Sequence, residues 1–275
     1  MCLHYLRDRG ILSPKKLDRW RIKPNSVFGR QATVKGLWGV VDRLNDWLNG
    51  SVFPLAFKGK HAPKQEHLRY VAGVFYGDDV TDAGNCPLSL DFQAYDFSFI
   101  AIETLSIVYE QFLHAPTRDG STAYGREIGA YYTPIPIVNM MLAELEERRP
   151  LERGIRVLDP SFGSGYFLVQ CFSGLVEKEF PPDTKPRPAE QRTLLDNHIF
   201  GIDLEEDPCN VTELSLTLTL LDYIDPLDVE DQRHRFKLPA LRNKNIFDSN
   251  FFADNVPWHS SFSKSGFDWI VGNSS

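Results

Sequence analysis

Apolar residues in the first third of the chain recur at the spacing of one buried helix face. They fall at i, i+3, i+4, i+7, i+10 and i+11, namely at Leu37, Val40, Val41, Leu44, Trp47 and Leu48. Gly50 ends this helix, and a second helical face follows at Ile102, Leu105, Tyr109 and Phe112. Turn-rich segments at 77–87 and 114–129 interrupt the chain. The pattern predicts a mainly helical N-terminal domain over residues 1–115.

From about residue 129 the pattern changes to alternating helices and strands. Helices are predicted over 135–149, over 165–180 and from Pro208 onward. Short apolar runs predict strands over 155–159, 198–203, 244–247 and 267–272. Four prolines between 181 and 188 mark an inserted loop. This order is typical of a parallel, doubly wound α/β sheet, to which we assign residues 116–275.

Composition narrows the class of protein. The chain has 275 residues, of which 42% are hydrophobic and 24% charged, as in an ordinary globular protein of one or two domains. Its four cysteines form no C-x-x-C pair and its seven histidines have no ligand spacing, so no metal site is predicted. No apolar stretch reaches the length of a membrane span, and the N-terminus lacks the apolar core of a signal peptide. We therefore expect a cytoplasmic protein with no membrane partner.

Charge is unevenly distributed along the chain. Residues 1–70 hold fourteen Lys and Arg against five Asp and Glu, a balance of +9, and the remaining residues carry −16. A cluster of cations can bind phosphates through counterion release, while a solvated helix face is the commoner interpretation. The cluster consists of Lys15, Lys16, Arg19, Arg21, Lys23 and Arg30. Both interpretations stay open.

A strand, turn and helix at 157–167 carry the most informative chemistry. The apolar strand ends in Asp159, and the turn Ser161-Phe162-Gly163-Ser164-Gly165 leads into the helix. Glycines let a backbone approach a ligand closely, and ligands bind at the carboxyl ends of strands in open α/β sheets. A tight turn without a ligand is the alternative. The dinucleotide fingerprint is incomplete, because Leu168 stands in place of its third glycine.

Three further segments place polar residues at the ends of predicted elements. Asp203 ends the second strand, where a carboxylate can bind both hydroxyls of a ribose or can cap the helix that begins near Asp207. Thr133 and Pro134 precede a helix, either as its N-cap and first residue or as part of a site that holds a carboxylate. The fourth strand delivers Asn273 at its carboxyl end.

In this order the segments resemble those of N6-adenine DNA methyltransferases, in particular the branch found in single-chain, type IIG-like restriction-modification enzymes and related phage-defence methylases. The matching segments are Tyr132-Thr133-Pro134, Leu158 to Gly165, Gly201-Ile202-Asp203 and Ile270 to Asn273, with Tyr95 to Ser98 and Ile107 to Glu110 ahead of them. The resemblance covers about residues 35 to 273. It implies an α/β fold with a partial, Rossmann-like S-adenosylmethionine-dependent methyltransferase sheet after a mainly helical domain.

The resemblance also implies roles for individual residues. The family residues that match Tyr132, Thr133 and Pro134 line the methionine end of S-adenosylmethionine. The loop around its amino-acid part matches Asp159, Ser161, Phe162, Gly163 and Gly165. Asp203 matches the carboxylate that binds the ribose, and Leu204 matches the residue beside the adenine ring. Asn245 and Ile246 match the next motif, whose first residue is usually Asp and bonds the cofactor's adenine. In an offset register Asp248 takes that role, and we favour Asn245.

Asn273 matches the first residue of the family's catalytic motif, Asn-Pro-Pro followed by an aromatic residue. In the family, the Asn side-chain oxygen and the first proline's carbonyl accept hydrogen bonds from the target amine. The aromatic residue stacks on the adenine, which is flipped out of the duplex. Here Ser274 and Ser275 stand in place of the prolines, and no aromatic residue follows. We therefore expect an incomplete chain that lacks methyl transfer by itself.

The sequence thus predicts a site-specific DNA adenine N6-methyltransferase of a restriction-modification or phage-defence system, with S-adenosylmethionine as cofactor and double-stranded DNA as partner. A nuclease or recognition region of a longer parent is a further candidate partner. Two alternatives stay open. One is a non-catalytic remnant that binds cofactor, DNA or a partner subunit, and the other is a methyltransferase acting on protein glutamine. The helical region ahead of the methylase domain favours DNA.

Overall fold

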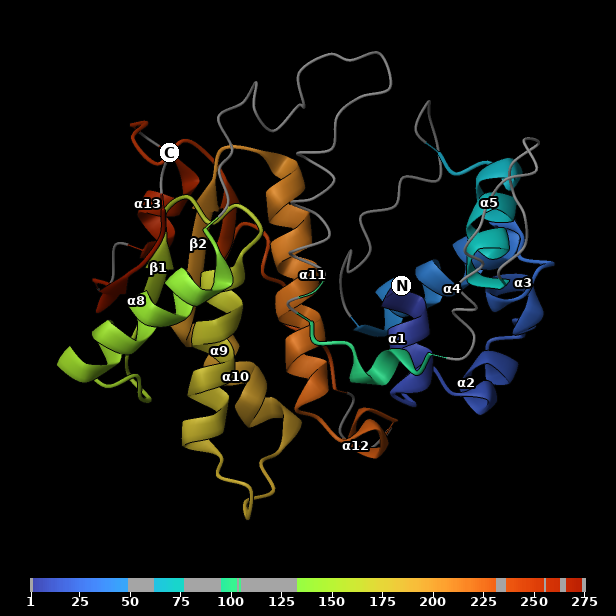
Figure 1. Ribbon diagram of the computed structural model, residues 1–275, viewed down its shortest axis with the longest axis horizontal. Coiled ribbons are helices and arrows are strands. Elements are labelled where there is room, and N and C mark those ends of the chain that lie inside the picture. The colour runs from blue at the N-terminus through green and yellow to red at the C-terminus, as the bar shows by residue number, and fades with distance from the viewer. Residues whose placement is uncertain are drawn as a thin grey trace. The chain divides into compact units, whose positions relative to one another are not determined.

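The computed structural model describes residues 2–48, 62–76, 95–102, 104, 133–230, 236–254, 256–262 and 266–273. The chain divides into an N-terminal unit, Met1–Ile100 with Val229–Lys237, and a sheet unit, Ala101–Asp228 with Leu238–Ser275 (Figure 1). The domain boundary predicted between residues 115 and 116 lies outside the described residues.

The described part of the N-terminal unit is helical. Its elements are α1 (Cys2–Asp8), α2 (Pro14–Arg19), α3 (Asn25–Phe28), α4 (Val34–Leu48), α5 (Gln65–Tyr76) and the 3-10 turn η2 (Phe97–Phe99). The predicted face of α4 is confirmed, because Val40, Val41 and Leu44 are buried. Most of the face predicted between residues 102 and 112 lies outside the described residues. The His4 ring of α1 stacks on Phe75 of α5, with centroids 4.4 Å apart.

The sheet unit is built on four strands. They are β1 (Val157–Asp159), β2 (Ile199–Asp203), β3 (Ile246–Asp248) and β4 (Trp269–Ile270), in the spatial order β3-β2-β1-β4. Every pairing in this sheet is parallel. The predicted parallel sheet is therefore confirmed in the described residues, and each strand overlaps its predicted range. The Rossmann-like order implied by the resemblance stays a prediction.

Helices connect these strands. They are α8 (Ile135–Arg148), α9 (Tyr166–Glu179), α10 (Pro188–His198), α11 (Glu206–Asp222), α12 (Pro226–Glu230) and α13 (Pro257–Phe262). The helices predicted over 135–149 and 165–180 and near Pro208 are confirmed as α8, α9 and α11. None of the described helices is long and apolar enough to cross a membrane.

The helix α10 has no counterpart among the predicted elements, and neither have the short helices α12 and α13. The buried residues of α10 include the polar Gln191 and His198, so its apolar periodicity is weak. A polar signal marks its start, because the Glu190 carboxylate accepts a hydrogen bond from the Arg187 N–H at 2.9 Å. The four prolines of 181–188 therefore belong to a loop that ends at the first residue of a helix.

The two faces of the sheet are covered differently. One face packs Leu158, Phe200, Ile202 and Phe247 against Phe262 of α13. The alternate residues face α9, since a Cβ built on Gly201 would lie 2.7 Å from the Leu168 side chain. Asp159, Gly201 and Ile246 share that second face through the parallel register. The carboxylate of β1 therefore points toward the side of the sheet that α9 covers.

Candidate functional site

Two carboxylates at the carboxyl ends of β1 and β2 are bonded to one loop. The Ser161 N–H donates to Asp159 Oδ1 at 3.1 Å. The Gly163 N–H donates to Asp203 Oδ2 at 2.9 Å. Because β1 and β2 are paired neighbours, the loop between Asp159 and α9 spans both strand ends. The predicted glycine-rich turn is thus a backbone link between the two carboxylates.

Asp159 is buried without a full set of partners. Its side chain is 0% exposed, and neither its Oδ2 nor the buried Ser161 Oγ has a hydrogen-bond partner among the described residues. Burial raises the pKa of Asp159 to about 8, which the Ser161 N–H opposes and the charge of Asp203 increases. Buried polar atoms without partners are unfavourable, so these two atoms fit a ligand that donates hydrogen bonds and carries positive charge.

Two glycines allow close approaches at this site. Gly165 precedes α9 with a φ of 77°, and a Cβ there would lie 2.3 Å from Thr212 Oγ1 of α11. Gly272 follows β4 with a φ of 147°, and its Cβ would lie 2.6 Å from Asp159 Oδ1. Both φ values lie in the region that favours glycine. Gly165 therefore packs the loop onto α11, and Gly272 brings the end of β4 against Asp159.

A pocket lies between the loop after β1, the residues after β4 and the start of α8. It is lined by Thr133, Val138, Asp159, Ser161, Phe162, Gly163, Ser164, Tyr166, Phe167 and Asn273. Asn273 Nδ2 donates to Thr133 Oγ1 at 3.1 Å. The structure thus brings predicted residues of three separate motifs to one pocket. Tyr132 lies outside the described residues.

Thr133 does not cap α8. The N-cap is Pro134, and no side chain makes the cap hydrogen bond. The interpretation of Thr133 as N-cap and Pro134 as first helical residue is therefore wrong by one position. The Thr133 hydroxyl contacts Asn273 instead.

Asp203 is the last residue of β2, at its carboxyl end. Its Oδ1 accepts a hydrogen bond from the Glu205 N–H at 3.1 Å, and the N-cap of α11 is Glu205. The alternative in which Asp203 caps this helix is therefore wrong. Burial raises the pKa of Asp203, against the effect of backbone N–H groups that donate to it. The neighbouring Leu204 side chain is 68% exposed, so it offers an apolar surface beside the carboxylate.

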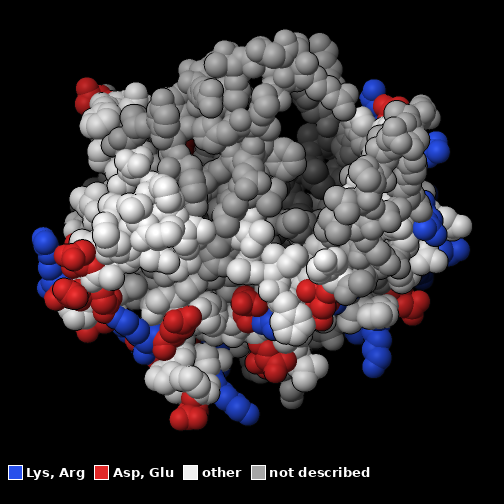
Figure 2. Space-filling model, viewed as in Figure 1, with Lys and Arg blue, Asp and Glu red and all other residues white. Residues whose placement is uncertain are grey.

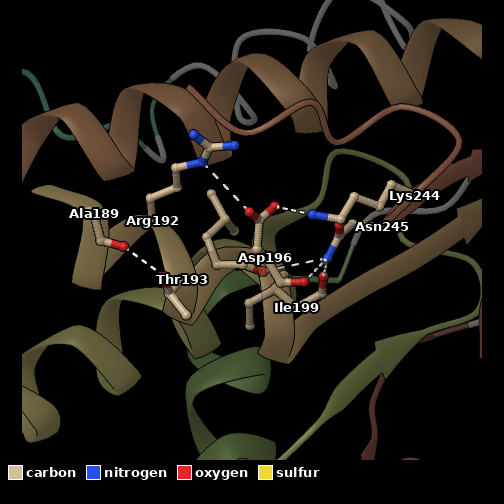
Figure 3. Close-up of polar contacts among 8 residues, drawn as sticks. Ala189, Arg192, Thr193, Asp196, Ile199, Lys244 and Asn245 are labelled. Carbon is tan, nitrogen blue, oxygen red and sulfur yellow. Dashed lines mark hydrogen bonds and ion pairs between the residues drawn. The ribbon is translucent and has the colours of Figure 1, made fainter. Parts of the chain in front are cut away.

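Asn245 lies at the opposite end of the sheet. Its Nδ2 donates to the carbonyl oxygens of Ile199 at 2.8 Å and of Asp196 at 3.0 Å (Figure 3). Ile199 is the first residue of β2, so these contacts lie at the amino end of the strand. This position does not support the predicted contact with a cofactor's adenine, because Asp159 and Asp203 mark the other end. Asn245 instead ties the start of β3 to the end of α10, and Ile246 after it is 0% exposed.

Asp248 lies at the carboxyl end of β3, where the resemblance led us to expect Asn245. It ends β3 opposite Asp203 in the register, and its side chain is 42% exposed. Arg242 Nη1 lies 3.7 Å from Asp248 Oδ1, and Arg242 Nε donates to Glu213 of α11 at 3.2 Å. The offset register, in which Asp248 takes the role, agrees with this placement.

A family model described as N-6 DNA methylase matches residues 100–268, which is more than half of the chain. The chain belongs to the N-6 DNA methylase family. The match with this family includes Thr133, Asp159, Asp203 and Asp248, and Asn273 lies beyond it.

This N-6 DNA methylase family member was also compared with curated proteins and with solved structures. No curated protein matches its sequence. One solved structure is that of a protein from Vibrio vulnificus YJ016 described as a modification subunit of a type I restriction enzyme. The identity is 23% and the TM-score 0.31, over 74% of this chain and 35% of that one. The chain therefore spans about a third of the length of that protein.

Several pocket residues of this family member were not predicted. Val138 comes from the first turns of α8, and Tyr166 and Phe167 begin α9. Their apolar character assigns them to helix faces that pack in the core. Tyr166 and Phe167 directly follow Gly165, and Val138 lies one helical turn after Pro134. This nearness to predicted residues is the signal that could have identified them.

Proposed function

We propose that the chain is the cofactor-binding part of an S-adenosylmethionine-dependent DNA methyltransferase that acts on the N6 amine of adenine. The observation that carries the proposal is the pocket in which the loop after β1, Thr133 and Asn273 meet. Membership in the N-6 DNA methylase family supports the reaction class. The motif order supports a type IIG-like restriction-modification or phage-defence enzyme with a Rossmann-like sheet. A DNA substrate supports a cytoplasmic location, with a nuclease or recognition region as partner.

The residues present fit S-adenosylmethionine. Asp159 Oδ2 and Ser161 Oγ are buried acceptors without partners, which suits the ammonium group of the cofactor's amino-acid part. The partly exposed Asp203 carboxylate suits the ribose hydroxyls, and exposed Leu204 suits the face of the adenine ring. When bound, the cofactor supplies an electrophilic methyl group.

Asp248 is the residue that we propose to bind the adenine of S-adenosylmethionine. Its carboxylate is exposed at the end of β3, where it can accept a hydrogen bond from an exocyclic amine. Arg242 Nη1 lies 3.7 Å from Asp248 Oδ1 and forms an ion pair with it. We therefore propose Asp248, and not Asn245, as the residue that contacts the adenine.

Asn273 supplies the chemistry on the target base. Its amide nitrogen donates to Thr133 Oγ1, which leaves the amide oxygen as the acceptor for the adenine amine. An acceptor at that amine concentrates electron density on the nitrogen as it attacks the methyl group. The base must leave the duplex to reach this position. Thr133 therefore orients the amide, and Asn273 contacts the base.

Calorimetric titration of S-adenosylmethionine into the chain tests the proposal. The wild type and Asp183→Ala are expected to bind, because Asp183 lies exposed in the loop before α10. Asp203→Ala is expected to weaken binding by about tenfold or more, since it removes a charged acceptor. Folded wild type that does not bind, or equal affinity of the two variants, would overturn the assignment.

A further inference from the structure

Eight of the ten Lys and Arg residues in the described part of the sheet unit form ion pairs. Ion pairs join cations and carboxylates at Arg148–Glu144, Arg149–Asp268, Arg153–Glu179, Lys178–Glu146, Arg187–Glu190, Arg192–Asp196, Arg242–Glu213 and Lys244–Asp196. In Figure 2 the blue groups on the left of the view lie against red ones. Residues 101–228 and 238–275, which make up this unit, hold 13 Lys and Arg against 25 Asp and Glu, a net charge of −12. This unit therefore has little unneutralised positive charge among its described residues with which to attract a polyanion.

The N-terminal unit has the opposite character between residues 15 and 35. This segment holds seven Lys and Arg and one acidic residue, Asp18. Five of the cations are exposed and form no ion pair with a described residue, namely Lys15, Arg19, Arg21, Lys23 and Lys35. We call these five residues the basic face.

Packing of α2 directs part of the basic face outward. Lys16 and Leu17 are buried, and Lys16 Nζ lies 3.2 Å from the centre of the Trp47 ring of α4. Lys15 and Arg19 are four residues apart on the opposite, exposed side of the helix. The helix is thus anchored by one cation and presents two others to solvent.

Arg21 occupies a backbone position that favours glycine. It follows α2 with a φ of 59°. Its N–H donates to the Asp18 carbonyl at 2.8 Å, and the Ile22 N–H donates to the Leu17 carbonyl at 2.9 Å. This is the hydrogen-bond pattern of a Schellman helix end, whose left-handed residue is usually glycine. The turn would be more stable with glycine, so the exposed arginine side chain serves something other than the turn.

We propose that the basic face binds the backbone phosphates of double-stranded DNA. The inference rests on the proposed function, because a DNA methyltransferase must hold a polyanion that its acidic sheet unit repels. Lysine and arginine side chains on a helix and its following turn suit phosphate contacts, which fix a protein on the duplex without reading sequence. The N-terminal unit therefore contributes affinity to DNA binding and leaves base recognition to other parts of the protein.

Fluorescence anisotropy with a labelled duplex of arbitrary sequence, about two helical turns long, tests the proposal across a salt series. The variant Lys15→Gln/Arg19→Gln/Lys23→Gln is compared with Arg148→Gln/Arg153→Gln/Lys185→Gln, which removes the same charge from exposed cations of the sheet unit. Each lost phosphate contact lowers the slope of log K against log salt by about 0.9, so we expect a decrease of up to about 2.7 in the first variant only. Equal slopes in the two variants would overturn the proposal.

Arg21→Gly separates DNA binding from folding. We expect it to raise the melting temperature and to weaken duplex binding, since glycine relieves the left-handed strain and removes a cation. Weaker binding cannot then come from unfolding. Wild-type protein that does not bind the duplex at low salt, or that binds single-stranded RNA more tightly than the duplex, contradicts the proposal.

Titration of S-adenosylmethionine into the same variants keeps the two hypotheses apart. Intact cofactor binding with unchanged DNA binding would reject the basic face and leave the proposed function standing. Loss of cofactor binding in the wild type would reject the proposed function whatever the DNA result.

Discussion

Replacing Asp159 with asparagine tests how the buried carboxyl makes the stability of the fold depend on pH. The wild-type carboxyl is 0% exposed, and burial raises its pKa from 3.8 to about 8. Because the folded state holds the proton more tightly than the unfolded state, this group stabilises the fold most at pH values below its unfolded pKa. That stability is lost as the pH rises toward the folded value of about 8. Asparagine has nearly the same shape and does not titrate.

The magnitude follows from the two pKa values. Asp159 ionises at a lower pH in the unfolded state than in the folded state. Between about pH 5 and about pH 8.5 this difference lowers the free energy of unfolding of the wild type by about 4 kcal/mol. Asp159→Asn lacks this decrease. The amide of the variant adds a cost that does not change with pH, because its NH₂ group replaces Asp159 Oδ2, which has no partner among the described residues. The difference between the two pH values therefore isolates the buried carboxyl.

Urea unfolding of both proteins at the two pH values measures this effect. Asp183→Asn serves as the control, since its carboxylate is exposed and is expected to leave the pH dependence unchanged. A wild type and an Asp159→Asn variant whose stabilities change in parallel with pH would refute the reasoning. Such a result would mean that Asp159 is solvated or paired in the native protein.

Three further substitutions test other parts of the site. Gly165→Ala is expected to lower the free energy of unfolding by about 3 kcal/mol, since its Cβ would collide with Thr212, whereas Gly266→Ala, with open space around it, changes the urea midpoint little. Asn245→Asp buries a charge beside backbone carbonyls and is expected to destabilise the fold by about 3 kcal/mol in the same assay. An unchanged urea midpoint would contradict the buried position of the Asn245 side chain. Asp248→Asn is expected to raise the dissociation constant of S-adenosylmethionine about tenfold at an unchanged melting temperature, and unchanged affinity would return the adenine contact to another residue.

Much of the sheet unit could be predicted because its strands and helices carry strong apolar patterns. The run ending in Asp159 and the run ending in Asp203 are buried parallel neighbours, as their composition indicates. The turn between Asp159 and α9 lies where a helix N-terminus follows a strand. The position of Thr133 beside Asn273 could not be read from spacing, because the two residues meet only through tertiary folding.

The sequence pattern alone does not show whether Asn245 or Asp248 lies at the carboxyl end of β3. Asn245 and Asp248 lie in one short apolar segment, and only the ladder decides which of them reaches the carboxyl end of β3. In a strand, a shift of three residues moves a side chain by about 10 Å and to the other face. A sequence match cannot resolve that difference, whereas the pairing of Asp248 with Asp203 does.

Asp159 and Arg21, one in the pocket of the sheet unit and one in the basic face, share a property. Each conflicts with its local structure, Asp159 because a carboxyl oxygen is buried without a partner among the described residues and Arg21 because its backbone has a positive φ. Residues that conflict with the local structure in this way concentrate at functional sites. In the proposed complexes, a cationic group in the pocket offsets the cost at Asp159, and a phosphate beside the side chain offsets the cost at Arg21. Arg21→Gly should therefore change stability and DNA affinity in opposite directions, a pattern that substitutions at residues that only pack the core cannot produce.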